Sequence, residues 1–453
     1  MIRRDFVKTS LLAGGLSGLQ KALGAKSLPP SREARGYGPL VRDPQKLLDL
    51  PEGFSYQILS KRGETMSDGL LVPGQADGMA AFPGKDGRVI IVRNHELGVG
   101  HSAWGPLPNA KNCPPELPCY DPGSDSELLM PGGTTHLIFN PATKKVENQF
   151  LSLFGTDRNC AGGPTPWGSW ITCEEPENLR EGRGQLHGWC FEVPADATAP
   201  QEPVPLKAMG RFRHEAVAVD PETGYVYLTE DRLNGLLYRF IPKVKGELHK
   251  GGRLQALSIA ESTIRDTRNW AKNVFREGAK YSIHWIDLEE TDSPRDDLRV
   301  RGAQAGAAIF ARCEGCWWHD GQLYFCATNG GSTRKGQLFR LQPATAKNTH
   351  PQLELFLEPR RSEVLTNGDN LTVGPHGDII IAEDRVVKEQ GHAPCGLRGV
   401  TPEGKLYTLA TNRLNRSELA GVCFSPDQQF LFVNIQNPSI TFAITGDWSK
   451  RQI

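Results

Sequence analysis

Acidic, amide and thiol side chains recur at matching places in a repeated pattern along the chain. The set comprises Asp77, Glu96, Cys160, Glu175, Glu215, Glu230, Glu314, Asp369, Glu383 and Glu418, with Asn94, Asn329, Asn370, Asn434 and Gln436 among them. If these carboxylates lie together, they repel one another strongly unless they are protonated or bound to cations. Carboxylate and carbonyl oxygens suit calcium, and a thiolate such as that of Cys160 adds affinity for iron or zinc. The residue types therefore predict a site for multivalent metal ions.

Arg312 lies two residues before Glu314, so both side chains share one face if the segment is a strand. A cation beside a metal-bound carboxylate is well placed to bind an oxyanion such as phosphate. A structural salt bridge to one of the acids is the alternative. The same alternation separates His95 from Glu96 and His214 from Glu215, and we expect the glutamates to face the site.

A sixfold repeat positions these residues. The recurring unit is an acidic or polar residue beside a glycine, a short apolar strand, a turn, and a second strand that ends in polar side chains. The copies span residues 77–96, 160–175, 215–231, 314–329, 369–384 and 418–436. Strands joined by Asp-Gly or Pro-x-Gly turns form antiparallel hairpins. Six units predict an all-β, six-bladed β-propeller, and one or two β-sandwiches are the alternative.

In a hairpin, the start of the first strand and the end of the second lie at the same edge. We therefore expect the polar residues of all six units to meet at one mouth of a central channel. Insertions at residues 100–131 and 243–301 are expected as loops over one face, with a helix over 257–277. One propeller domain over 51–453, after a linker at 26–50, accounts for the chain.

Composition and the N-terminus narrow the function. The chain has 453 residues, 49 of them glycine and 33 proline, which excludes long helical bundles, and its zero net charge argues against nucleic-acid binding.

Residues 1–25 contain Arg3-Arg4 and a short apolar stretch, and they resemble a twin-arginine export signal; a basic N-terminal helix is the alternative. We expect export of the folded protein by the twin-arginine machinery to the periplasm or medium, with no transmembrane segment in the mature protein. Cys113 and Cys119 are spaced to close a loop.

The motifs resemble those of the PhoX-type bacterial alkaline phosphatases. The similarity covers much of the chain and is carried by residues 159–175, 213–215, 229–231, 310–315, 369–371 and 418–437. It implies a six-bladed propeller whose cofactor is a pair of iron ions joined by a bridging oxygen and surrounded by calcium ions. The expected activity is hydrolysis of small phosphate esters by a metal-dependent phosphomonoesterase.

The resemblance also implies roles for particular residues. Cys160 is expected as an iron ligand, Glu175 and Glu215 as carboxylate ligands, Glu314 as a ligand with a catalytic role, and Arg312 as the catalytic phosphate contact. Repeat phase adds four expected metal ligands: Glu96, Asp369, Glu383 and Glu418. Two other functions fit the same architecture. A calcium-dependent lactonase or esterase would not need Cys160, and a non-catalytic exported binding propeller would not need the acids.

Overall fold

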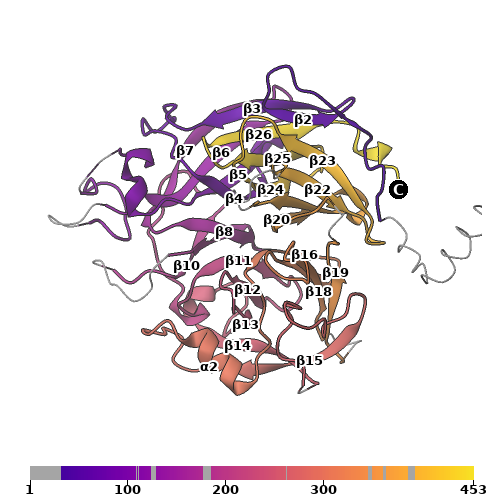
Figure 1. The fold of residues 1–453 in the computed structure, drawn as a ribbon. Helices are drawn as coiled ribbons and strands as arrows, with labels where there is room; N and C mark the ends of the chain where they lie inside the picture. The colour runs from indigo at the N-terminus through magenta and orange to yellow at the C-terminus, as the bar shows by residue number, and fades with distance from the viewer. Residues whose placement is uncertain are drawn as a thin grey trace, which may run out of the picture. The chain divides into compact units, whose positions relative to one another are not determined.

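The computed structural model describes residues 32–108, 110, 112–123, 129–176, 185–261, 263–344, 349–360, 364–385 and 393–453. The chain divides into two compact units, Met1–Glu33 and Ala34–Ile453, and the second unit carries the features below. It consists mainly of β-strands (Figure 1), and its described part contains one short α-helix, α2 (Leu298–Ala305). No helix among the described residues has the length and apolar character needed to cross a membrane. The predicted export signal at 1–25 lies outside the described residues.

Six antiparallel hairpins form the centre of this unit. Their inner strands are β4 (Ala76–Pro83), β8 (Asn159–Pro164), β11 (His214–Val219), β16 (Cys313–His319), β20 (Gly368–Val373) and β24 (Leu419–Phe424). The strands that pair with them are β5 (Val89–His95), β9 (Ser169–Glu174), β12 (Val226–Glu230), β17 (Gln322–Ala327), β21 (Ile379–Glu383) and β25 (Phe430–Ile435). Each inner strand contacts the next along the chain, and β24 contacts β4. The inner strands therefore form a closed ring, and the arrangement is propeller-like (Figure 1).

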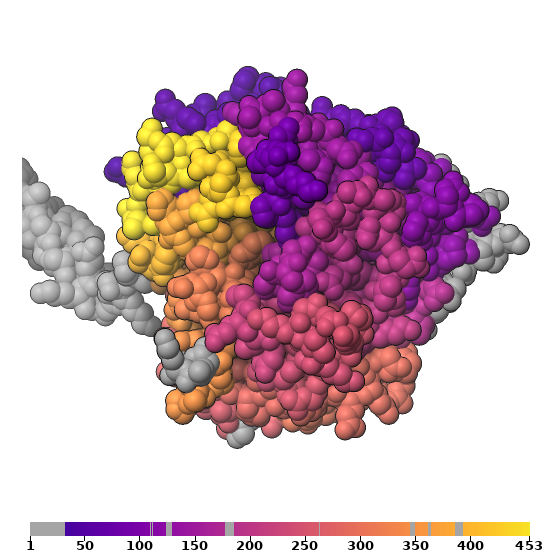
Figure 2. All heavy atoms as spheres, turned by 180° about the vertical axis from the view of Figure 1, so that it is seen from behind, coloured from indigo at the N-terminus to yellow at the C-terminus, as the bar shows by residue number. Residues whose placement is uncertain are grey.

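Further strands extend each hairpin outwards. Third strands are β6 (Gly132–Asn140), β10 (Cys190–Pro194), β13 (Leu237–Pro242), β18 (Gln337–Gln342), β22 (Gly396–Val400) and β26 (Ile440–Thr445). Outer strands are β7 (Lys145–Thr156), β14 (Gly252–Ile259), β19 (Gln352–Leu357), β23 (Leu406–Asn412) and β3 (Ser55–Lys61). Because β3 pairs with β26, the two ends of the unit lie side by side in one sheet. In Figure 2 the indigo and yellow segments adjoin on the opposite face.

Apolar side chains pack between neighbouring sheets. Met79 and Ile91 from one sheet, for example, pack with Cys423 and Phe432 from the adjacent sheet. The inner strands are buried on both faces, which explains why their sequences are nearly continuous apolar and small-residue runs after the first polar positions. The repeat thus forms a ring in which each sheet is packed between two others.

Every inner strand has an irregular register just after its second residue, for instance between Ala76 and Met79 and between Asn159 and Gly162. Such bulges redirect side chains near functional sites. The bulges pack tightly, because a Cβ added to Gly78 would lie 2.7 Å from Ala161 Cα. Asn94 Nδ2 also donates to the Ala161 carbonyl at 2.7 Å, which ties β5 to the next inner strand.

The structure corrects two expectations about the insertions and the linker. Within the predicted helix 257–277, residues 257–259 belong to β14, and the remaining described residues form no helix. The buried strand pairing of β14 with β13 and β15 (Lys280–Asp287) prevails over the local helical pattern. β15 also pairs with β19, which joins two hairpin sets into a nine-stranded sheet. Part of the expected linker forms β1 (Leu40–Val41) and β2 (Leu48–Pro51), because Leu48 and Leu50 are buried next to β23.

Candidate metal centre

Three positions in each hairpin unit bring polar side chains to one mouth of the ring. The opening residue precedes the inner strand, the second residue lies in that strand, and the closing residue follows the paired strand. In all six units the closing residue donates its backbone N–H to the carbonyl of the opening residue, over 2.8–3.3 Å. This bond seals the hairpin end and holds the three positions next to one another.

The second residues form the deepest layer. They are Asp77, Cys160, Glu215, Glu314, Asp369 and Ala420. Five of the six offer a metal-binding atom, and in the sixth unit Glu418 occupies the opening position two residues before Ala420. The bulge that follows each second residue allows these side chains to converge.

The closing residues complete overlapping groups of donors. They are Glu96, Glu175, Asp231, Thr328, Asp384 and Gln436. In each of four groups, the ligand atoms lie within 4.8 Å of one another: Asp77/Glu96/Cys160, Cys160/Glu175/Glu215, Glu215/Glu314/Asp369 and Asp369/Asp384/Glu418. The groups share members, so they form one continuous cluster around the channel mouth. All the expected ligands except Glu383 lie in it.

Glu383 does not lie in the cluster. As the last residue of β21 it is fully buried and accepts hydrogen bonds from the backbone N–H groups of Thr366 and Gly396, both at 3.0 Å. It also pairs with Arg385 at 2.8 Å and Arg398 at 2.9 Å. The side chain therefore holds the sheet edge together, and the next residue, Asp384, takes the expected place.

Glu230 was also expected at the mouth, and it too lies outside the cluster. It accepts from the Tyr238 hydroxyl at 2.7 Å and from the Leu236 N–H at 3.2 Å, and Asp231 is the residue that reaches the site. In the other units Glu174 and His95 also turn into the sheet, while Glu175 and Glu96 face the cluster. The Glu-Asp pairs at 230–231 and 383–384 stand at the same repeat position as 174–175, which is the signal that could have identified Asp231 and Asp384.

Several carboxylates of the cluster are destabilised in their charged form. Burial and neighbouring carboxylates raise the pKa of Asp77, Glu215 and Glu418 well above the usual range, and the pKa of Asp369 to about 8. Both Glu215 oxygens and Asp77 Oδ1 are buried and have no hydrogen-bond partner among the described residues. Unpaired buried oxygens are costly, and bound cations would satisfy them. The donor set therefore fits metal ions.

Three consecutive opening residues are arginines. Arg312 contacts Asp231 and Glu314, each at 2.7 Å, and Arg213 contacts Glu175 at 2.6 Å. Arg158 pairs with Glu96. Their side chains are 20–23% exposed, whereas the acids they contact are almost fully buried. The arginines therefore lie on the solvent side of the acids and form an arc suited to an oxyanion.

Arg312 has an unusual backbone. Its φ is 54°, in the left-handed region that non-glycine residues rarely adopt. The conformation is held by two backbone hydrogen bonds, from the Arg312 N–H to the Arg232 carbonyl and from the Thr328 N–H to the Arg312 carbonyl, each 2.8 Å long. The neighbouring acids also raise the Arg312 pKa against the effect of burial, so the guanidinium is always charged.

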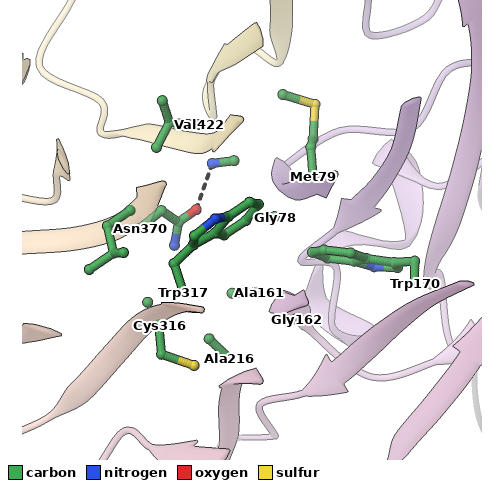
Figure 3. Close-up of a pocket in the computed structure, with 13 residues that line it drawn as sticks. Gly78, Met79, Ala161, Gly162, Trp170, Ala216, Cys316, Trp317, Asn370 and Val422 are labelled. Carbon is green, nitrogen blue, oxygen red and sulfur yellow. Dashed lines mark hydrogen bonds between the residues drawn. The ribbon is translucent and has the colours of Figure 1, made fainter. Parts of the chain in front are cut away.

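The channel beyond the acids is apolar and narrow. Met79, Trp170, Trp317 and Val422 line a cavity of about 20 Å³ there, and a hydrogen bond from the Gly421 N–H to Asn370 Oδ1 crosses between strands (Figure 3). Such a volume holds about one water molecule. Any ligand larger than a water molecule must therefore approach the acids from the arginine side.

The remaining cysteines outside the cluster are also free thiols. Cys113 and Cys119, which were expected to close a loop, donate weakly to the carbonyls of Leu117 and Asp121. Cys313 and Cys316 are buried in β16 on either side of its bulge. Among the buried cysteines, Cys160 alone belongs to the acid cluster.

The fold and the site define a propeller-like protein whose mouth is lined by possible metal ligands, with a layer of acids and one thiol beneath an arc of arginines. The family model described as alkaline phosphatase PhoX matches residues 35–118 and 123–439. The chain belongs to the PhoX alkaline phosphatase family. It is accordingly a phosphomonoesterase, as the resemblance of its motifs implied. The alternative of a non-catalytic binding propeller is therefore wrong.

The similarity to one solved structure, given first below, supports the fold. Pseudomonas fluorescens PhoX, in complex with the transition-state analogue vanadate, is 19% identical with a TM-score of 0.65, over 89% of this chain and 96% of that chain. A gluconolactonase from Xanthomonas campestris is 11% identical with a TM-score of 0.39, over 92% and 99% of the two chains. The WD40 β-propeller domain of Doa1 is 8% identical with a TM-score of 0.40, over 88% and 99%. No curated protein sequence matches the chain.

Proposed function

We propose that the chain is an exported six-bladed propeller that hydrolyses small phosphate monoesters at a cluster of iron and calcium ions. The observation that carries the proposal is the position of Cys160. Its thiol lies within 4.8 Å of carboxylate oxygens of Asp77, Glu96, Glu175 and Glu215, at the mouth of a ring of six hairpins. A calcium-dependent lactonase would need oxygen ligands only, so the buried thiol favours a site that includes a transition metal.

The blade count rests on the ring of inner strands. Six hairpins contact one another in chain order and close through β24 and β4. The nine-stranded sheet contains two of these hairpins, and the pairing of β15 with β19 at the outer edge joins them into one sheet. We therefore assign each hairpin to one blade, with β3 completing the last blade from the N-terminal side.

The donors differ in character around the mouth. Cys160 with Glu175 and Glu215 offers sulfur and oxygen together, which suits iron, whereas Asp369, Asp384 and Glu418 offer oxygen alone, which suits calcium. Nine carboxylates and three arginines face the site within the described part of the chain, an excess of six negative charges if all ionise. When bound, multivalent ions would supply the Lewis acidity that neutralises charge on the reacting phosphate.

The arginines supply the other half of the chemistry. Arg312 donates through Nε and Nη2 to Asp231, and its Nη1 is left to donate to a phosphate oxygen. Arg312, held by its locked backbone and by Asp231, would orient the phosphate and stabilise charge on its equatorial oxygens. Arg213 lies 3.2 Å from Asp231 Oδ2, which also accepts from Arg312, and so continues the same charged surface. An ester that enters from the arginine side contacts both the arginines and the acids beneath them.

The proposed test compares Cys160→Ala with Cys423→Ala, another buried cysteine that packs among apolar residues away from the acids. We expect Cys160→Ala to lower hydrolysis of p-nitrophenyl phosphate at least ~100-fold and to lose iron, because the thiolate ligand is gone. Cys423→Ala should keep both. Full activity with normal iron content in Cys160→Ala would overturn the proposal.

Export is proposed from the sequence of residues 1–25. Paired arginines followed by a short apolar stretch are typical of the twin-arginine route, which carries folded proteins. Transport after folding suits an enzyme that acquires metal ions before export. Replacing Arg3 and Arg4 by lysine should leave active enzyme inside the cytoplasm; unchanged export of that variant would contradict the proposal.

A further inference from the structure

A second group of possible metal-binding atoms lies inside the protein, apart from the acid cluster. Cys173 from β9, Cys190 from β10 and His214 from β11 place one donor atom each within 4.8 Å of the others. All three side chains are fully buried. The two sulfurs are 3.7 Å apart, and Cys190 Sγ lies 3.3 Å from His214 Nδ1. Nothing in the proposed phosphatase chemistry uses this group.

Side-chain alternation separates the group from the acid cluster. His214 directly precedes Glu215 in β11, so the imidazole and the carboxylate lie on opposite faces of the strand. Cys173 stands directly opposite Cys190 in the ladder between β9 and β10. The group of three residues has apolar surroundings, because Ile171 and Val217 pack in the same core. The three donors therefore lie together in the apolar core, apart from the acid cluster.

The imidazole of His214 is oriented for ligation. Nε2 lies 2.9 Å from the Gly210 carbonyl, which only accepts, so Nε2 carries the proton. In the neutral ring, Nδ1 then keeps its lone pair, and this atom faces Cys190. A backbone carbonyl bound to the second ring nitrogen is typical of metal-binding histidines. The ring also stacks on Phe212 with 3.6 Å between centroids, which restricts its rotation.

We propose that Cys173, Cys190 and His214 bind a thiophilic divalent cation, with Zn²⁺ as the fitting ion. With sulfurs 3.7 Å apart and Zn–S bonds of about 2.3 Å, the S–Zn–S angle is about 107°. With a Zn–N bond of about 2.05 Å, the 3.3 Å separation of sulfur and nitrogen gives an angle of about 100°. Both angles approximate the tetrahedral geometry of zinc, and the donor atoms of Cys173 and His214 lie within 4.8 Å of each other.

Charge selects a divalent ion. Binding forms two Zn–S bonds and one Zn–N bond, and each thiol releases one proton to solvent. Two thiolates then neutralise Zn²⁺, so the filled site has no net charge and tolerates its apolar surroundings. A monovalent ion such as Cu⁺ would leave one negative charge buried.

Such an ion would join two neighbouring sheets. β9 and β10 belong to one sheet, and β11 belongs to the next. Cys173 lies two residues before Glu175, and His214 lies one residue before Glu215. Zinc here would fix the relative position of the strands that present these two acids. The role of this ion would be structural, because no donor of the group reaches the channel mouth.

The test uses Cys160→Ala as the background, which removes the thiol of the acid cluster. Zinc per chain is measured by elemental analysis after expression with added zinc, in this background alone and with Cys190→Val, Cys190→Ser or Cys423→Val. We expect the Cys190 variants to hold one zinc fewer per chain and the Cys423 variant to hold the same amount as the background. Cobalt loading should give a thiolate-to-cobalt absorption band that only the Cys190 variants lack.

Other outcomes would overturn the proposal. Serine is close to cysteine in shape, so Cys190→Ser should fold. If this folded variant holds as much zinc as the background, the group is a hydrogen-bonded set of thiols and an imidazole and not a zinc site. A Cys173–Cys190 disulfide detected by mass spectrometry in the purified protein would equally contradict it, because the sulfurs would then lack the charge that holds the ion.

Discussion

Adjacent acids at the end of β21 should respond to neutralisation in opposite ways. Glu383 is fully buried and accepts from two backbone N–H groups and two arginines. Glutamine keeps its size but removes the charge and places an N–H₂ group against these donors. Breaking a buried ion pair costs about 3–5 kcal/mol. We expect Glu383→Gln to lower the free energy of unfolding by about that amount while the folded enzyme keeps its activity and metals.

Asp384 has the reverse environment. Burial and the neighbouring acids Glu96 and Asp231 raise its pKa, although Arg312 opposes them. Removing this charge takes away repulsion in the metal-free protein, so Asp384→Asn should change its unfolding free energy by less than about 1 kcal/mol. The same variant loses a donor of the group that includes Asp369 and Glu418. Calcium content should fall, and phosphatase activity should fall at least ~10-fold.

Three measurements on both variants separate the two roles. Urea unfolding of the metal-free proteins gives stability, elemental analysis gives calcium per chain, and p-nitrophenyl phosphate hydrolysis gives activity. Asp384→Asn with normal calcium and activity would refute the assignment of the closing residue as the ligand. So would a stable Glu383→Gln that has lost its metals, because that result would place Glu383 in the cluster.

Arg312→Lys should lower kcat/KM about 100-fold with metal content unchanged, because Arg312 holds Asp231 and Glu314 through Nε and Nη2 while Nη1 is left for phosphate, and a single ammonium group cannot do both; a change of less than twofold would remove Arg312 from the phosphate site. His187 lies between Glu174 and Asp121, and these carboxylates raise its pKa to about 10 despite burial. Its contribution to stability is complete below pH 6.5, the usual pKa, and is lost as the pH rises towards 10. Urea unfolding should therefore show up to about 5 kcal/mol separating wild type from His187→Gln at pH 6, and little at pH 10.5; a constant difference would contradict a charged His187.

The repeat made much of the centre predictable. Hairpin geometry alone brings Asp77 and Glu96 to one edge, and six copies in phase bring their equivalents together. Alternation also separated Glu215 from His214 correctly. These inferences depend on local rules that hold inside any regular antiparallel strand.

The errors occur where regular strands end. Glu383 is the last paired residue of β21 and Asp384 has already left the ladder, so side-chain alternation gave no guide to which of them faces the mouth. The helix predicted over 257–277 failed because the strands that pair with β14 lie elsewhere along the chain. The Cys173, Cys190 and His214 group was missed for a similar reason: the three residues meet only through pairing and packing of separate hairpins.

The most direct test of the metal centre is elemental analysis of folded wild-type protein, set beside its phosphomonoesterase activity before and after calcium chelation. We predict that iron and calcium are both present, that chelation abolishes hydrolysis, and that added calcium restores it. A single calcium ion without any transition metal, or full activity after calcium is removed, would contradict the account.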